Sequence, residues 1–186
     1  MRKCSEYITA MRIELERKRL VSSGSTDNAR ITELGCYMTL CAMVIEHKFL
    51  AYKNAMNNNY KMQNFITAAA FARLILDLEP TGIFASKPET IPQIKKYYQV
   101  FQQKGTNALK INFEPSLNIE LREVNGYLCT STLSPLADGR SANTLKCPLD
   151  GSVYAKNLET IGKVCDTCGL CKLGEAAIGL NNLIEE

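Results

Sequence analysis

The stretch Phe65-Ile-Thr-Ala-Ala-Ala-Phe-Ala-Arg-Leu-Ile-Leu76 carries its apolar side chains at helical spacing. Residues three and four positions apart share one face of a helix, and small alanines on that face let a neighbour approach closely. The segment therefore predicts a buried helix packed against another helix. Glu79-Pro80 follows it, and a proline disfavours helical backbone in the residue before it, so we expect the helix to end there.

The same periodicity runs upstream from Ile31 to Tyr60 without a proline. One helix of more than thirty residues is improbable, so we predict a break between Cys41 and Lys48. Asn57-Asn58-Asn59 weakens helix propensity and is expected to mark the end of this segment. With the alanine-rich helix it predicts an antiparallel hairpin of the TPR-like kind that ends a helical solenoid.

Two further helices are predicted at the edges of this helical part. From Cys4 to Leu20 an amphipathic helix is expected to bury a stripe formed by Tyr7, Ile8, Met11 and Leu15. A polar connector follows, in which Asp27 or Asn28 is expected to cap a second helix that begins near Ala29. A last helix is predicted from Ile91 to Phe101, with Pro92 in its first turn and Gly105 beyond its end.

The pattern then changes from helical periodicity to alternation. Residues 108–113 alternate, and residues 126–132 are rich in strand formers, so both are predicted to be strands. Residues 135–143 contain proline, glycine, aspartate and serine, which favours a long hairpin loop. The predicted fold class is α+β, with a helical subdomain over residues 1–105 and a β-rich subdomain over residues 106–186.

Composition excludes several classes of protein. Of 186 residues, 46% are hydrophobic, which is enough for a buried core, and 22 basic against 19 acidic residues leave a net charge of only +3. No nucleic-acid partner is predicted from this charge. The apolar runs are too short for a membrane-spanning helix, and the charged first twenty residues do not resemble a secretory signal, so a cytoplasmic location is expected. Among the eight cysteines, Cys4, Cys36 and Cys41 are interpreted as reduced core residues.

The remaining five cysteines form the sharpest local motif. Cys147-Pro-Leu-Asp-Gly151 and Cys165-Asp-Thr-Cys168-Gly-Leu-Cys171 resemble a pair of zinc knuckles, in which Asp150 stands where the second thiolate of the first knuckle would be. The predicted ligands of a structural zinc are Cys147, Cys165, Cys168 and Cys129, with Asp150 or Cys171 as alternatives for the fourth position. The other interpretation is a metal-free hairpin with relic cysteines, and no cofactor is required by the sequence.

No catalytic constellation is found, and we expect no enzyme activity. Cys165 and Cys168 have the spacing of a redox pair, but the glycines around them indicate a turn rather than a helix start. His47, the single histidine, lies in a predicted helix. A zinc-ribbon module that binds nucleic acid or protein is the alternative function, although few basic or aromatic residues accompany the knuckles.

Several blocks, in order, resemble the carboxy-terminal region of coatomer alpha subunits. They are Glu6–Arg19, Lys61–Arg73, Asn107–Asn112, Cys129, Lys146-Cys147-Pro148 and Gly179-Leu180. The resemblance covers nearly the whole chain. The chain departs from it before Tyr52, where relatives usually carry a proline, and at the cysteines, of which relatives keep different numbers.

The resemblance implies a non-catalytic part of the COPI vesicle coat, which acts in retrograde Golgi-to-ER and intra-Golgi transport. It implies a cytoplasmic protein that is peripheral on Golgi and COPI vesicle membranes and reaches other coatomer subunits through the rest of the alpha chain. It also implies that a β hairpin of alpha is clasped by the epsilon subunit, and residues 127–147 are the candidate for that hairpin. The contact residues predicted there are Tyr127, Leu128, Leu133, Leu136 and Leu145, because a hairpin without its partner would leave these apolar side chains in water.

Overall fold

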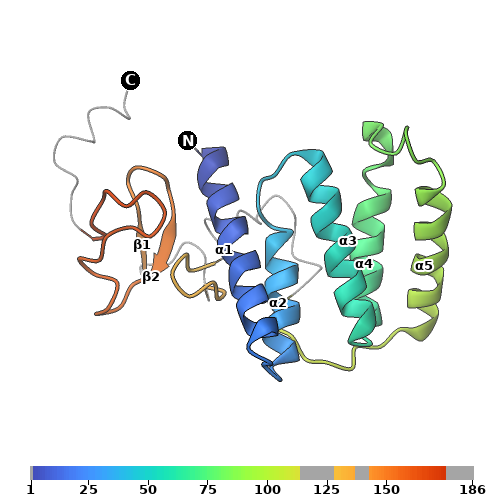
Figure 1. Cartoon of the computed structure of the whole chain (residues 1–186), viewed down its shortest axis with the longest axis horizontal. Coiled ribbons are helices and arrows are strands. Elements are labelled where there is room, and N and C mark those ends of the chain that lie inside the picture. The colour runs from blue at the N-terminus through green and yellow to red at the C-terminus, as the bar shows by residue number, and fades with distance from the viewer. Residues whose placement is uncertain (1, 114–127, 137–142, 175–186) are drawn as a thin grey trace. The chain divides into compact units, whose positions relative to one another are not determined.

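The computed structural model describes residues 2–113, 128–136 and 143–174 (Figure 1). Helices come first and a small sheet follows, in agreement with the predicted α+β class. The elements are α1 (Arg2–Ser22), α2 (Asn28–Met38), α3 (Ile45–Lys61), α4 (Phe65–Leu76), the 3-10 helix η1 (Glu79–Thr81), α5 (Thr90–Lys104), β1 (Thr144–Lys146) and β2 (Val153–Ala155).

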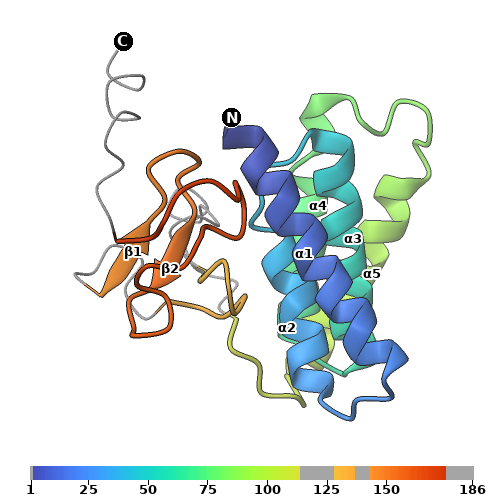
Figure 2. The same ribbon diagram turned by 60° about the vertical axis from the view of Figure 1, so that its left-hand side comes forward.

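Helices α2 to α5 pack in sequence order, each against the next, and Figures 1 and 2 show them running in alternating directions. The predicted helix break is confirmed, because α2 ends at Met38 and α3 begins at Ile45. It starts two residues earlier than expected. The predicted cap is also confirmed, since the Asp27 carboxylate accepts a hydrogen bond from the Arg30 amide at 2.9 Å.

Helices α4 and α5 match their predicted stripes. The predicted stripe of α4 is buried apart from the partly exposed Leu76; it consists of Phe65, Ala68, Ala69, Ala72, Ile75 and Leu76. In α5, Ile91, Ile94 and Phe101 are buried. Gly105 ends α5 in the left-handed conformation, with φ 56°, and donates its amide to the Phe101 carbonyl.

Buried asparagine amides connect α3, α4 and the segment after α5. Asn59 is fully buried in α3, and its amide nitrogen donates to the Ala55 carbonyl and to the Cys36 sulfur at 3.2 Å. Asn64 donates to the side-chain oxygen of Asn59, and its own oxygen accepts the amide of Leu109 at 2.8 Å. Asn107 caps α4 from outside that helix. The network joins two of the blocks on which the family resemblance rests, residues 61–73 and 107–112.

Helix α1 exists as predicted, but the predicted buried face is wrong. Ile8 is 40% exposed, Met11 52% and Leu15 66%. The buried side of the helix is instead formed by Ser5, Glu6, Thr9, Ala10 and Ile13. This face combines the short side chains of Ser5 and Ala10 with the larger Glu6 and Ile13, so the size of the apolar side chains does not decide which face is buried. Cys4, expected in the core, is also exposed.

The β-rich part differs from the sequence prediction. Within the described residues no strand forms over 108–113 or over 128–132, and the sheet has only β1 and β2, paired antiparallel with Leu145 opposite Tyr154. Residues 147–152 therefore form the turn of this hairpin. Residues 128–135 instead make a short turn closed by a bridge between Leu128 and Pro135. Residues 114–127 and 137–142, including Tyr127 and most of the predicted loop, lie outside the described residues.

The chain divides into two compact units, Ile13–Leu117 and Met1–Arg12 with Asn118–Glu186. The prediction placed all of α1 with the other helices, whereas its first half clusters with the β-rich part. None of the helices in the described ranges is long and apolar enough to cross a membrane.

Candidate metal centre

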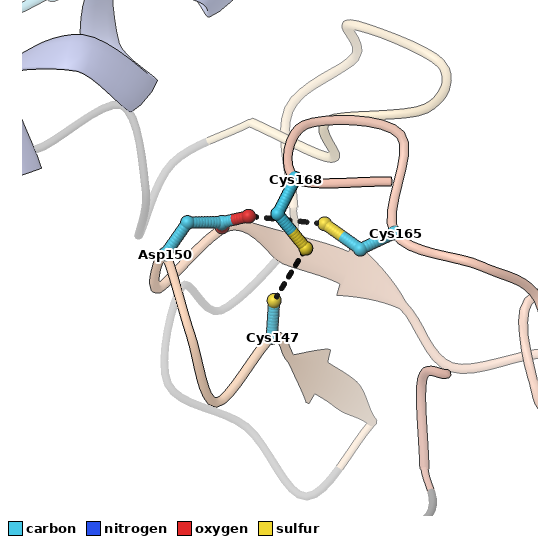
Figure 3. A group of neighbouring side chains, drawn as sticks. All are labelled: Cys147, Asp150, Cys165 and Cys168. Carbon is cyan, nitrogen blue, oxygen red and sulfur yellow. Dashed lines mark hydrogen bonds between the residues drawn. The ribbon is translucent and has the colours of Figure 1, made fainter. Parts of the chain in front are cut away.

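The first knuckle is the turn between β1 and β2. Cys147 follows β1, its amide donates to the Ser152 carbonyl, and the Gly151 amide donates back to the Cys147 carbonyl at 3.0 Å. Gly151 has φ 77°, a conformation that glycine adopts without strain. The turn holds Cys147 and Asp150 three residues apart on the same side of the loop (Figure 3).

The second knuckle repeats this pattern. Cys165 donates its amide to the Cys171 carbonyl at 2.7 Å, and the Gly169 amide donates to the Cys165 carbonyl at 2.9 Å. Gly169 has φ 67°. A bridge between Val164 and Lys172 closes the loop, as the pairing of β1 with β2 closes the first. Cys165 and Cys168 therefore occupy the positions that Cys147 and Asp150 occupy in the other turn.

Together the two turns bring four potential ligands to one place. The ligand atoms of Cys147, Asp150, Cys165 and Cys168 all lie within 4.8 Å of one another, and Figure 3 shows them pointing inward. The sulfurs of Cys147 and Cys168 are 3.7 Å apart, and the Cys165 thiol donates to the Asp150 carboxylate at 3.2 Å. Cys147 and Cys165 are buried, while Asp150 and Cys168 are partly exposed.

Neighbouring polar groups fix the position of these side chains. The second oxygen of Asp150 accepts the Ser152 amide at 2.7 Å, which orients the carboxylate. The Ser152 hydroxyl donates to the Thr167 hydroxyl at 2.9 Å and so ties one knuckle to the other. The Tyr154 hydroxyl lies 3.2 Å from the Cys165 sulfur and accepts the Asp166 amide. The sequence prediction missed Ser152 and Tyr154; their positions beside the first knuckle were the only signal.

Burial and hydrogen bonding move the pKa values of the four groups in different directions. Burial raises the pKa of the Cys147 and Cys165 thiols, because it removes their thiolates from water. Burial also opposes ionisation of Asp150, but hydrogen bonds from Ser152 outweigh it and lower the pKa of that carboxyl. Burial is likewise outweighed at Cys168, where backbone amides of Cys171 and Leu170 lower the pKa of the thiol.

Three of the four predicted ligands are brought together, and the fourth place is taken by Asp150 rather than Cys129. The Cys129 sulfur lies outside the group and accepts the Ala155 amide at 3.4 Å. Cys171, the other alternative, is buried in the adjoining apolar cluster with Tyr154 and Leu173 and is also outside the group. Asp150 has the place that the Cys-x-x-Cys spacing gives to a second ligand.

The predicted partner-binding leucines among the described residues are buried or partly buried. Leu128 is 0% exposed and Leu133 5%, so the expectation that these side chains stand in water is wrong for both. Leu136 and Leu145 are partly buried against the cysteine-rich cluster. Partner binding by this segment itself stays a prediction.

Comparison with known proteins gives the family. Residues 1–185 match the family model that describes the C-terminus of the coatomer (COPI) alpha subunit. The chain is 32% identical over 182 residues to coatomer subunit alpha of Dictyostelium discoideum, and 31% identical over 176 residues to coatomer subunit alpha-2 of Arabidopsis thaliana. It is 28% identical over 175 residues to the Saccharomyces cerevisiae coatomer subunit alpha.

These alignments cover 94 to 95% of the chain but only 13% of each relative. The resemblance inferred from the ordered blocks is thus confirmed over the whole length of the chain. The chain belongs to the family formed by the carboxy-terminal regions of coatomer (COPI) alpha subunits.

Proposed function

We propose that this chain is a non-catalytic protein-binding region of the alpha subunit of the COPI coat, and that it binds the epsilon subunit. The match to the coatomer alpha family over residues 1–185 carries the proposal. In this proposal the helical unit ends the solenoid of a longer alpha chain, through which the other coatomer subunits are reached. The coat acts from the cytoplasm on Golgi and vesicle membranes in retrograde Golgi-to-ER and intra-Golgi transport.

The exposed face of α1 supports a role in protein binding. Ile8, Met11 and Leu15 are spaced i, i+3 and i+7, so their side chains line one face of the helix. All three are well exposed. An apolar stripe of this spacing is the pattern with which a helix docks into a groove of another protein. We therefore propose this α1 stripe, defined by Ile8, Met11 and Leu15, as a contact surface for the epsilon subunit.

The absence of catalysis is part of the proposal. His47 is exposed on α3 and is not a member of the cysteine cluster. At that cluster, four ligand atoms lie within 4.8 Å of one another, enough to fill the four positions of one zinc ion. An arrangement of this kind is suited to holding a loop in place.

The first experiment is size-exclusion chromatography with light scattering on the 186-residue chain mixed with the epsilon subunit. We expect a one-to-one complex. The double variant Met11→Asp with Leu15→Asp should weaken it by more than about tenfold, because charges replace apolar contacts at the interface. Leu50→Asp is the matched control, since Leu50 on α3 is 52% exposed, as Met11 is.

Failure of the unsubstituted chain to bind the epsilon subunit would refute the proposed partner. Undiminished binding by the double variant would refute the α1 stripe alone. Leu133→Asp is unsuitable as a probe, because Leu133 is buried and its loss would unfold the β-rich part. Leu136→Asp, at a partly buried position, tests the predicted hairpin contact with less damage to the core.

A further inference from the structure

We propose that Cys147, Asp150, Cys165 and Cys168 bind one structural Zn²⁺, with the Asp150 carboxylate as the fourth ligand. The site is independent of the proposed coat function, because it follows from the geometry of the two knuckles. In the described ranges, these four residues form a group of metal-ligating side chains that are close enough to share one ion.

The distances fit a tetrahedral zinc site. With Zn–S bonds of about 2.3 Å, two sulfurs on one ion are separated by about 3.8 Å. The sulfurs of Cys147 and Cys168 are already 3.7 Å apart. A sulfur and an oxygen on the same ion would be about 3.6 Å apart. The Cys165 sulfur and the Asp150 oxygen are 3.2 Å apart while the thiol proton bridges them. Replacing that proton by the metal requires this pair to separate by only a few tenths of an ångström, and the remaining ligand pairs lie within 4.8 Å of one another.

The repeated backbone geometry is a second, independent observation. In each knuckle the first cysteine carbonyl accepts an amide from a glycine four residues later, and that glycine has a positive φ. In the second knuckle the Thr167 amide donates to the Cys165 sulfur at 3.4 Å, and the Leu170 amide donates to the Cys168 sulfur at 3.5 Å. A turn that directs backbone N–H groups at a sulfur is arranged to stabilise a metal-bound thiolate.

The loaded site would carry a net negative charge, which neighbouring groups must stabilise. Binding replaces three thiol protons, which are released to solvent, and leaves three thiolates and one carboxylate around a doubly charged cation. The ligand set and the ion together then carry two net negative charges. Two hydrogen bonds from backbone amides offset part of this negative charge. The Leu170 amide donates to the Cys168 sulfur at 3.5 Å, and the Ser152 amide donates to the Asp150 carboxylate. These hydrogen bonds exist in the structure, so the surroundings are already ordered for the charged form.

The ligand chemistry favours zinc with a structural role. Three soft sulfurs and one carboxylate oxygen in a tetrahedral arrangement suit Zn²⁺ rather than Ca²⁺ or Mg²⁺, which take oxygen ligands. Four protein ligands fill the four positions, as in zinc sites that stabilise folds. A carboxylate is a harder ligand than a thiolate, so this site should hold zinc less tightly than a site with four cysteines.

The test compares variants that change the fourth ligand and keep every thiol. The reduced chain is loaded with Zn²⁺ or Co²⁺, and metal content, affinity against a chelating dye and the Co²⁺ absorption spectrum are measured. We expect one metal per chain and a tetrahedral, sulfur-rich Co²⁺ spectrum. Asp150→Asn should weaken binding by more than about tenfold. Asp150→Cys should tighten binding and increase the sulfur-to-cobalt charge-transfer intensity by about a third, as three thiolates become four.

Matched controls separate ligands from neighbours. Asp166→Asn removes another carboxylate of the second knuckle, one that pairs with Lys163 at 3.1 Å and lies outside the ligand group. Cys129→Ser removes a cysteine outside the ligand group, and Cys171→Ser removes one whose thiol hydrogen-bonds with Cys147 and Cys168 without belonging to the group. All three controls should bind one metal with an affinity within about threefold of the unsubstituted chain.

Two results would overturn the proposal. A reduced and folded chain that binds neither Zn²⁺ nor Co²⁺ would show that the knuckles hold together without metal. Full binding by Asp150→Asn, together with loss of binding in Cys129→Ser or Cys171→Ser, would assign the fourth position to a cysteine.

Discussion

Replacing Asn59 by alanine should destabilise the helical unit, although alanine is the better helix former. Asn59 is 0% exposed, donates to the Cys36 sulfur at 3.2 Å and accepts from Asn64 at 3.4 Å. Its removal leaves the buried Asn64 amide group without this partner, which costs about 1–3 kcal/mol. The void left by the amide adds about 1 kcal/mol. The higher helix propensity of alanine stabilises the variant by about 0.6 kcal/mol and offsets part of this cost. The expected net loss is about 1.5–3.5 kcal/mol.

The same helix provides a matched control. Asn57 is two residues away and exposed. Asn57→Ala therefore changes helix propensity alone and should stabilise the chain by about 0.6 kcal/mol. Urea denaturation followed by far-UV circular dichroism measures both variants. The two should differ by at least about 2 kcal/mol in the free energy of unfolding.

A difference below about 0.5 kcal/mol would refute this reasoning, because burial and the hydrogen-bond network would then contribute nothing beyond propensity. The double-mutant cycle with Asn64→Ala gives a further check. Since the two side chains share one hydrogen bond, the cost of the double variant should be less than the sum of the single costs.

Three other outcomes are expected. Asn107→Ala should cost about 1 kcal/mol in the same denaturation assay, because the Asn107 oxygen caps α4 by accepting the amides of Ile66 and Thr67 at 3.0 and 3.3 Å. In the native chain, iodoacetamide should modify the exposed Cys4 and spare Cys36, because burial raises the pKa of the Cys36 thiol to about 12. Mass spectrometry of peptides measures the modification, and modification of Cys36 before unfolding would contradict the prediction. If the zinc proposal holds, removing the metal with a chelator should increase amide hydrogen exchange over residues 144–173 while exchange in α3 and α4 stays unchanged.

The helices were predictable because their information is local. Periodic apolar residues, the Asp27 cap and the Gly105 stop each act within a few residues, and outside α1 each is found where the sequence placed it. Burial of Asn59 was not predictable in this way. As an isolated residue in a run of asparagines it indicates the end of a helix, and only the positions of Cys36 and Asn64 give it buried partners.

The strands were poorly predicted because the sheet is set by the knuckles. Each strand has three residues, too few to show an alternating pattern, and their register follows from the turn that holds Cys147 and Asp150. The propensity of residues 108–113 for a strand is overridden by their contacts with the helices, where Asn112 accepts from Tyr37 and donates to Glu33. In contrast, spacing predicted three members of the candidate metal site, Cys147, Cys165 and Cys168, whereas it left the fourth open and favoured Cys129 over Asp150.

The misassigned face of α1 connects the sequence error to the proposed function. Hydrophobicity selected Ile8, Met11 and Leu15 as the core stripe, whereas the structure buries Ser5, Thr9 and Ala10 on the opposite side. Glu6 and Ile13 are buried on that side as well, so the helix has a buried face and a separate exposed apolar face. The proposed contact with the epsilon subunit rests on this exposed stripe, and the Met11 and Leu15 substitutions test it without touching the buried face.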